Sequence, residues 1–495
     1  MKTAREGAGN GVWWTGRTRL GRRRWLGLAA AATVTAAGCG PVTAARPRVA
    51  APKIVLGAVL DIPASQTLGS LSERNQLYAQ VLATFEAANR GIAVRVLPYT
   101  STAVISASII GGDGPDLFAD TAPSYAGYIG QNLLLRLDGY FSRDNVDTSI
   151  WSSTVVDALQ TAGGTFGINR GLDAYAFAVN LSLLDSLGLP YPSTDWTHGE
   201  FAGLAKQIAA NVNGKQRYGA SFQGGPGGFL GTLAEVTAGF GGAVTDDART
   251  TQTLSAQPAL AGVEWLLENL FFPSAGIDGT GPANLYAQTA GIQEIQQVQL
   301  LTDYQQWRDT FRWVLYPPPV YPRGRVGGAA ANYWAISGNT GHPEAAWTLL
   351  RWMSTEAPYE RLLMKAFLFP PSLNALMPEW EATAEAVAPG LKNRGLQWFT
   401  QSGDQGWGRA EPWFAYANNQ AVAIDTAWWN RVLARSVGAQ SALTQADGQV
   451  GALIRASAGQ STTLAQEVVA QKALSQRLDR MFAAGSAGTS STAGG

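Results

Sequence analysis

Short apolar runs alternate with helical periodicity in the first part of the chain. Residues 54–60 form a continuous apolar run typical of a buried strand, and apolar positions recur at helical spacing through 77–88. Further strands are predicted at 92–97 and 115–119, with a helix at 104–110 between them. This strand–helix order predicts an α/β lobe with a mainly parallel sheet. The glycines that follow the second helix have no Lys-Ser/Thr after them, so we interpret them as a turn rather than a phosphate loop.

The N-terminal pattern is that of an export signal. A basic segment, 17–24, precedes an apolar segment, 25–37, which is too short to span a bilayer core of ~30 Å. Cys39 is the only cysteine, and the small residues before it resemble the lipobox of bacterial lipoproteins, which implies lipidation of Cys39. The alternative is an ordinary signal with an incidental cysteine. Arg22-Arg23 also resembles a twin-arginine signal, so the export route stays open.

Length and composition narrow the class of protein. A chain of 495 residues exceeds what one hydrophobic core supports, so two lobes are expected. The formal net charge is zero and the basic residues do not cluster after the N-terminal part, so we expect no nucleic-acid partner. The chain has 17 Trp; most should fill cores, and a subset on loops would suit the stacking of sugar rings.

Three groups of motifs carry a family resemblance. Gly114-Pro115-Asp116-Leu117-Phe118 comes first, then 166–201 with Asn180 and the Trp196/Phe201 helix entry, and then 317–354 with its proline run, glycine pair and Trp334. In this order they resemble the carbohydrate-type, maltodextrin-binding-like extracellular solute-binding proteins of ABC importers. The pattern departs from the family at 286–306, which is rich in Gln, and at 393–419, which aligns poorly.

The resemblance implies a two-lobe periplasmic-binding-protein clamp of the class II type. Each lobe would be a mainly parallel α/β sheet flanked by helices, and crossing strands near 166–177 and 316–332 would form the hinge. It implies a monomer that delivers a carbohydrate to membrane permease subunits, from the outer face of the cell membrane or from a periplasm, with no cofactor or metal. The expected segments are a lipoprotein signal peptide (1–38), a lipidated tether (39–52), lobe 1 (53–170), lobe 2 (171–320), a return to lobe 1 (321–375), a C-terminal helical part (376–482) with an amphipathic helix at 464–482, and a disordered tail (483–495).

Candidate cleft residues lie where loops leave the predicted strands or where the family places its ligand contacts. Carboxylates and amides suit sugar hydroxyls because they offer charged or bidentate hydrogen bonds. Asp173, seven residues before Asn180, matches the family's acidic ligand-binding position and is the strongest candidate. The full set is Asp120, Thr121, Ser124, Tyr125, Asp173, Tyr175, Phe222, Gln223, Asn332, Tyr333, Trp334, Trp407, Arg409, Trp413 and Tyr416.

Several of these residues have a structural alternative. Asp120 could cap a helix, Tyr175 could pack in a hinge strand, and Trp334 could be a core residue rather than a stacking platform. The two histidines, His198 and His342, lie far apart, and no nucleophile motif is present, so the sequence favours a binding protein over an enzyme. Alternatives are the same fold with a polyamine, glycerol phosphate or organic anion as ligand, a glycoside hydrolase with two carboxylates, or a sensory partner of a membrane receptor.

Overall fold

The computed structural model separates the chain into two units, Met1–Ala51 and Pro52–Gly495, and every described residue belongs to the second. The described residues are 53–60, 71–98, 101–161, 164–223, 229–277, 284–308, 310–367, 370–410 and 412–459. The predicted signal peptide, Cys39, the tether, the helix at 464–482 and the tail therefore lie outside them. No helix of the described part is long and apolar enough to cross a membrane.

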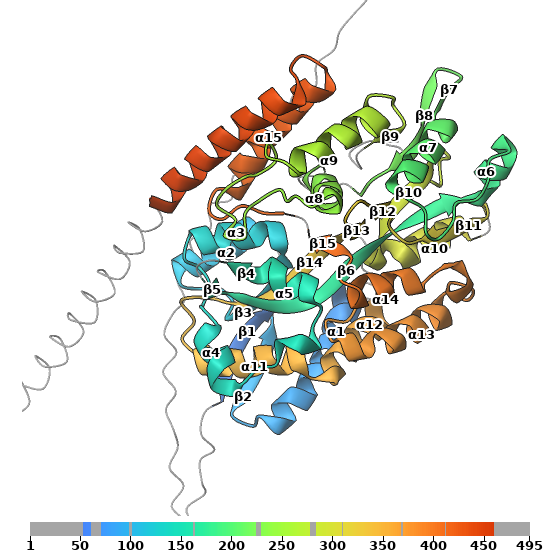
Figure 1. Ribbon diagram of the computed structural model, residues 1–495. Helices are drawn as coiled ribbons and strands as arrows, with labels where there is room; N and C mark the ends of the chain where they lie inside the picture. Colours follow the sequence, from blue (N-terminus) through green and yellow to red (C-terminus); the bar gives the residue numbers. More distant parts are fainter. Residues whose placement is uncertain are drawn as a thin grey trace, which may run out of the picture. The chain divides into compact units, whose positions relative to one another are not determined.

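The strands and helices of the N-terminal half follow the predicted order (Figure 1). The strands are β1 (Ile54–Val59), β2 (Ile92–Val96), β3 (Leu117–Thr121), β4 (Gln160–Thr161), β5 (Gly164–Thr165), β6 (Gly167–Asn180), β7 (Ala210–Val212) and β8 (Lys215–Ser221). The helices are α1 (Leu71–Ala88), α2 (Thr102–Gly111), α3 (Ala122–Gly130), α4 (Asp138–Asp144), α5 (Ser153–Leu159), α6 (Leu181–Leu187), α7 (His198–Ile208) and α8 (Phe229–Phe240). The predicted glycine turn is confirmed, since Gly112 closes α2 in the left-handed region with φ +87°.

The second half adds the remaining elements of both lobes. Its strands include β10 (Ala290–Gln296), β11 (Trp313–Tyr316), β12 (Val320–Tyr321), β13 (Gly324–Arg325), β14 (Gly327–Ile336) and β15 (Gly408–Ala410). Its helices include α9 (Ala259–Leu266), α10 (Leu300–Trp307), α11 (Pro343–Thr355), α12 (Ala357–Phe367), α13 (Met377–Val387), α14 (Gln397–Asp404) and α15 (Asn418–Leu433). A further helix covers 439–459.

Two strands in the middle of the main sheet join its two halves. The strand order is β2-β1-β3-β14-β6-β10-β8-β7. β1 pairs in parallel with β2 and β3 at one end, and β10 pairs in parallel with β8 at the other. β14 is antiparallel to β3 and to β6, and it pairs in parallel with the short β15. The 14-residue β6 pairs first with β14 and then with β10 and β11, all antiparallel. β6 is therefore the crossing strand between the halves, as Figure 1 shows.

Two hydrophobic cores pack against the sheet, and the first also includes residues of β10, β11 and α10. The first core contains Phe118 and Trp334 together with residues of α11 to α14, and the second contains Phe177 and Phe201 together with residues of α8, α9 and α15. Burial of such aromatic and aliphatic side chains is the main force that stabilises each lobe. These two cores agree with the predicted class of fold, an α/β clamp whose lobes share crossing strands.

Local sequence explains where the elements of the second lobe begin. Thr197 caps α7 in a capping box with Glu200, and Trp196 packs edge-on against Phe201 with ring centroids 5.3 Å apart. Asn180 ends β6 and caps α6 by accepting a hydrogen bond from the backbone N–H of Leu183. These are the positions at which the sequence predicted a helix entry and an Asn-containing turn.

Candidate ligand-binding site at the strand ends

Three of the predicted residues come together where the crossing strand meets the ends of β8 and β10. Gln296, the last residue of β10, pairs with Tyr175 of β6, and its side-chain amide donates to the Tyr175 hydroxyl across 2.9 Å. Asp173 lies two residues earlier on β6, and Gln223 follows the end of β8. Because β8 and β10 are parallel, their carboxyl ends reach the same edge of the sheet, which is where ligands bind in open α/β sheets.

Two backbone N–H groups hold the Asp173 carboxylate in place. Its Oδ1 accepts a hydrogen bond from the backbone N–H of Val298 across 2.8 Å, and the N–H of Gln297 also donates to the carboxylate. The side chain is 2% exposed. Burial raises the pKa of Asp173 to about 7, and the two backbone donors oppose that rise. Near neutral pH this carboxyl can therefore present either a donor or an acceptor to a hydroxyl group.

Gln297 belongs to the same cluster, although the sequence reasoning did not single it out. Its side chain is fully buried, and neither its Oε1 nor its Nε2 has a hydrogen-bond partner among the described residues. A buried amide without partners costs free energy unless a water or ligand satisfies it. The signal in the sequence is the glutamine-rich stretch 286–306, where the chain departs from the family pattern.

Asn332 connects this cluster to the end of β3. It pairs with Thr121 on one side and with Gly171 of β6 on the other, and Ala330 on the same strand pairs with Asp173. Thr121 and Asn332 are half-buried. β14 therefore lies between the predicted first-lobe residues on β3 and the predicted hinge residues on β6.

Asp120 and Ser124 are engaged within the first lobe. The Asp120 carboxylate accepts hydrogen bonds from the hydroxyl of Tyr128, from that of Thr102 and from the backbone N–H of Thr121. It does not cap α3, because Thr121 occupies the N-cap position. Burial raises the pKa of Asp120, and these hydrogen bonds oppose the rise. The Ser124 hydroxyl donates to the carbonyl oxygen of Thr121 across 2.7 Å.

Five of the predicted aromatic residues fill cores. These residues are at most 1% exposed and pack among other core side chains. Tyr125 and Tyr333 pack with ring centroids 4.6 Å apart, and the guanidinium of Arg170 lies over the Trp334 ring. For Trp334 the structure places the side chain in the core. The five residues are Tyr125, Phe222, Tyr333, Trp334 and Trp413.

The last predicted residues lie on β15 and the segments beside it, and β15 pairs with the start of β14, with Arg409 opposite Gly328. Trp407 is half-buried under the guanidinium of Arg325, and Tyr416 is half-buried with φ +66°. Arg409 is exposed and bonds to the backbone carbonyls of Gly406 and Gly408. The structure brings none of these three to Asp173.

Arg409 lines a cavity of about 1010 Å³ between elements of the two cores. One wall is α5 and the segment around β15, and the other is α8 with the loop 242–249. Arg249 of that loop reaches across it: its guanidinium donates to the carbonyl oxygens of Asp157 and Ala158 at 3.2 Å and lies 4.4 Å from the Trp413 ring centre. The cavity is therefore bridged by one side chain that touches both lobes.

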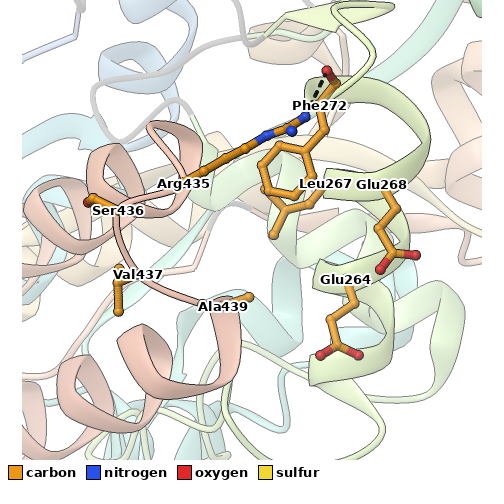
Figure 2. Close-up of a pocket in the computed structure, with 9 residues that line it drawn as sticks. Glu264, Leu267, Glu268, Phe272, Arg435, Ser436, Val437 and Ala439 are labelled. Atoms are coloured by element: carbon orange, nitrogen blue, oxygen red, sulfur yellow. Dashed lines mark hydrogen bonds between the residues drawn. The ribbon is translucent and has the colours of Figure 1, made fainter.

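A smaller pocket of about 500 Å³ lies on the second lobe, between α9 with the π-helical turn after it and the segment 435–439 (Figure 2). Arg435 stacks over Phe272 there, and the carboxylates of Glu264 and Glu268 lie along one side. Its described lining contains no strand-end residue. Within the described part of the chain, no group of three or more His, Cys, Asp or Glu side chains could hold a metal ion.

Comparison with known proteins identifies the class that this fold and strand-end cluster define. The sequence profile of the bacterial extracellular solute-binding protein family matches residues 69–360, so the chain belongs to that family. The family is extracellular, which makes this an exported protein. A search of curated protein sequences finds no match.

Solved structures share the fold at low sequence identity. An ABC substrate-binding protein from Listeria monocytogenes, in complex with cycloalternan, superposes with a TM-score of 0.61 at 17% identity, over 81% of this chain and 99% of that one. The maltose/maltodextrin-binding domain MalE from Bdellovibrio bacteriovorus, bound to maltotriose, has a TM-score of 0.54 at 18% identity, over 81% and 100%. UgpB from Mycobacterium tuberculosis, in complex with glycerophosphocholine, has a TM-score of 0.60 at 13% identity, over 81% and 98%.

Proposed function

We propose that this protein is the substrate-binding component of an ABC importer and that it captures a carbohydrate between its lobes. One lobe would comprise residues 53–170 and 321–375 and the other residues 171–320, with the hinge at β6 and β14. Ligand would bind at the ends of β8 and β10 and would be delivered to membrane permease subunits when the clamp closes. Closure would be driven by contacts that form only when both lobes meet around the ligand.

The observation that supports a sugar is the chemistry of the strand-end cluster. Asp173, Tyr175, Gln296 and Gln297 supply a carboxyl, a phenol and two amides, and all four are neutral or can become so near neutral pH. Sugar hydroxyls pair with such groups because each hydroxyl both donates and accepts. A phosphate or carboxylate ligand would instead call for bidentate Arg contacts, whereas Asp173 accepts from the backbone N–H of Val298 and the Gln296 amide donates to the Tyr175 hydroxyl.

A glycerophosphodiester is the second candidate ligand, because one structure of the same fold holds glycerophosphocholine. The two ligands are separated by a thermal-shift and calorimetry series with maltotriose, cycloalternan and glycerophosphocholine. A ligand that binds only the folded state raises the unfolding midpoint in proportion to RT ln(1 + [L]/Kd). We expect stoichiometric binding of an oligosaccharide without its hydrolysis; turnover of the sugar would instead indicate a glycoside hydrolase.

We also propose that the mature protein is tethered to the outer face of the membrane by lipid on Cys39. Metabolic labelling with a palmitate analogue in a bacterial host should mark the wild-type protein and leave Cys39→Ser unlabelled. Equal labelling of both proteins, or of neither, would remove the lipid anchor from the account and leave the ligand-binding proposal untouched.

A further inference from the structure

Two carboxyl groups are buried against each other behind the strand-end cluster. Glu235, in the middle of α8, is 1% exposed, and Glu294, near the end of β10, is 2% exposed. The two carboxyl groups lie close enough for their charges to repel, and this repulsion adds to burial in raising the pKa of Glu235. Oε2 of Glu235 and Oε1 of Glu294 are buried and have no hydrogen-bond partner among the described residues. A hydrogen bond between two carboxyl groups needs a proton on one of them, because two carboxylates only repel.

The surroundings of this pair supply neutral donors rather than a positive charge. The Tyr321 hydroxyl donates to Oε1 of Glu235 across 3.3 Å, and the backbone N–H of Gln223 donates to Oε2 of Glu294 across 2.9 Å. Neither glutamate takes part in an ion pair within the described chain.

The charged groups on the elements packed around the pair face other partners. On the hairpin that carries Tyr321, Arg325 pairs with Asp195, and the Arg323 side chain lies against Gly241. On β6, the titratable neighbours are Tyr175, whose hydroxyl accepts from Gln296, and Asp173, whose carboxylate caps Val298. Nothing among these contacts would compensate a second negative charge on the pair.

The pair also touches both lobes at the hinge. Gly328 is the second residue of β14, and a Cβ atom added there would lie 2.4 Å from Cδ2 of Tyr175 and 3.2 Å from Oε1 of Glu294. On the other side of the pair, Gln223 follows the end of β8, and its backbone N–H donates to Glu294. A change in the separation of the two carboxyl groups would therefore move β14, Tyr175 and the end of β8 relative to one another.

We propose that Glu235 and Glu294 are a positioning pair: they share one proton and so hold the Gln223 end of β8 and the start of β14 in the geometry that binds ligand. This inference rests on the proposed function for the identity of the ligand, and it adds a pH control of ligand affinity. Loss of the shared proton at alkaline pH leaves two buried charges that repel each other, which loosens the hinge end of the site. Ligand affinity then falls with rising pH even for a sugar that does not titrate, by up to about tenfold per pH unit for one linked proton.

The shared proton can be observed without any ligand. Protein labelled with ¹³C at the glutamate side-chain carboxyl should show a protonated carboxyl in infrared or NMR spectra at pH 7, and Glu235→Gln should remove it. Glu360→Gln is the matched control, because Glu360 is a buried acid in the first lobe whose pKa is raised to about 7 by burial. If the only protonated glutamate signal disappears in Glu360→Gln and persists in Glu235→Gln, the pair holds no proton and the inference is wrong.

Positioning is tested by pH profiles of the full chain. Glu235→Gln keeps a donor to Glu294 at every pH, so amide hydrogen exchange at Gln223 and Gly328, corrected for the intrinsic rate, should increase between pH 6 and pH 9 in the wild type and stay flat in the variant. Maltotriose affinity should fall more steeply with rising pH in the wild type than in the variant, in which only the titration of Asp173 contributes. Identical exchange profiles in wild type and variant would overturn the inference. Failure of every sugar to bind would overturn only the proposed ligand, because exchange still reports the pair.

Discussion

The backbone N–H of Val298 donates to the carboxylate of Asp173 across 2.8 Å, and this bond ties the crossing strand β6 to the turn that leads into α10. The residue that the family pattern marks for ligand is thus also a structural acceptor. A single carboxyl group then couples the position of the site to the position of the hinge, and substitutions there should affect both stability and binding.

Replacing Asp173 separates these two roles. Asp173→Ala leaves the buried N–H of Val298 without its acceptor and should lower the free energy of unfolding by about 1–3 kcal/mol. Asp173→Asn keeps an acceptor oxygen and should lower the free energy of unfolding by less. Both variants should weaken sugar binding, whereas Asp425→Asn, at a buried acid in α15 whose pKa is also raised to about 7, should leave binding unchanged. Equal binding by all three variants would remove Asp173 from the site.

The stability of Asp173→Asn relative to wild type should depend on pH. The pKa of Asp173 is about 7 in the folded protein and 3.8 is its ordinary value, so the folded state binds the proton more tightly than the unfolded state. Wild-type stability from this group is therefore present at low pH and is lost as pH rises from about 4 through 7. The free energy of unfolding in urea, measured at pH 5 and pH 8, should be higher for Asp173→Asn relative to wild type at pH 8 than at pH 5. A difference that is the same at both pH values would contradict the raised pKa.

Gly328 should tolerate no side chain. Its added Cβ would overlap the Tyr175 ring at 2.4 Å, so Gly328→Ala should lower stability by about 1–3 kcal/mol and weaken ligand binding, through displacement of Tyr175. Gly448→Ala is the control, because nothing lies within 4 Å of a Cβ there and the residue is in the helix 439–459. That change should be neutral or stabilising by about 0.5–1 kcal/mol. Similar losses in both variants would contradict the close packing at the hinge.

Arg249 should act as a connection between the lobes. Arg249→Ala removes two hydrogen bonds to α5 and the contact with Trp413, and should lower stability by about 1–3 kcal/mol. It should also increase the radius of gyration of the ligand-free protein in small-angle scattering. Arg435→Ala breaks a comparable arginine–aromatic contact within the second lobe, with Phe272, and should leave the radius unchanged. An unchanged radius in Arg249→Ala would mean that this contact does not restrain the lobes.

The fold was predictable because its signals are local. Apolar runs gave β1, β2 and β3, and the capping positions Thr197 and Asn180 begin helices as expected. The class of fold followed from motifs in the right order, and the family match bears it out. The pairing of β14 with both β3 and β6 could not be derived from periodicity, because it joins residues more than a hundred positions apart.

The site was less predictable, because burial depends on distant neighbours. Trp334 and Asn332 are two residues apart on β14, yet one fills the first core and the other remains half-buried near the site. Gln297 carries no motif; its importance appears only when β10 and β6 pair and leave its amide without a partner. Glu235 and Glu294 are likewise far apart in sequence, so nothing in the sequence alone could indicate that they share a buried contact.

Isothermal titration calorimetry of wild type and Asp173→Asn with a panel of oligosaccharides tests most directly whether Asp173 and its neighbours bind a sugar. We predict one-to-one binding of at least one oligosaccharide by the wild type, with affinity lowered about tenfold or more in Asp173→Asn. Binding of glycerophosphocholine in place of every sugar, or sugar binding that is unaffected by the substitution, would contradict it.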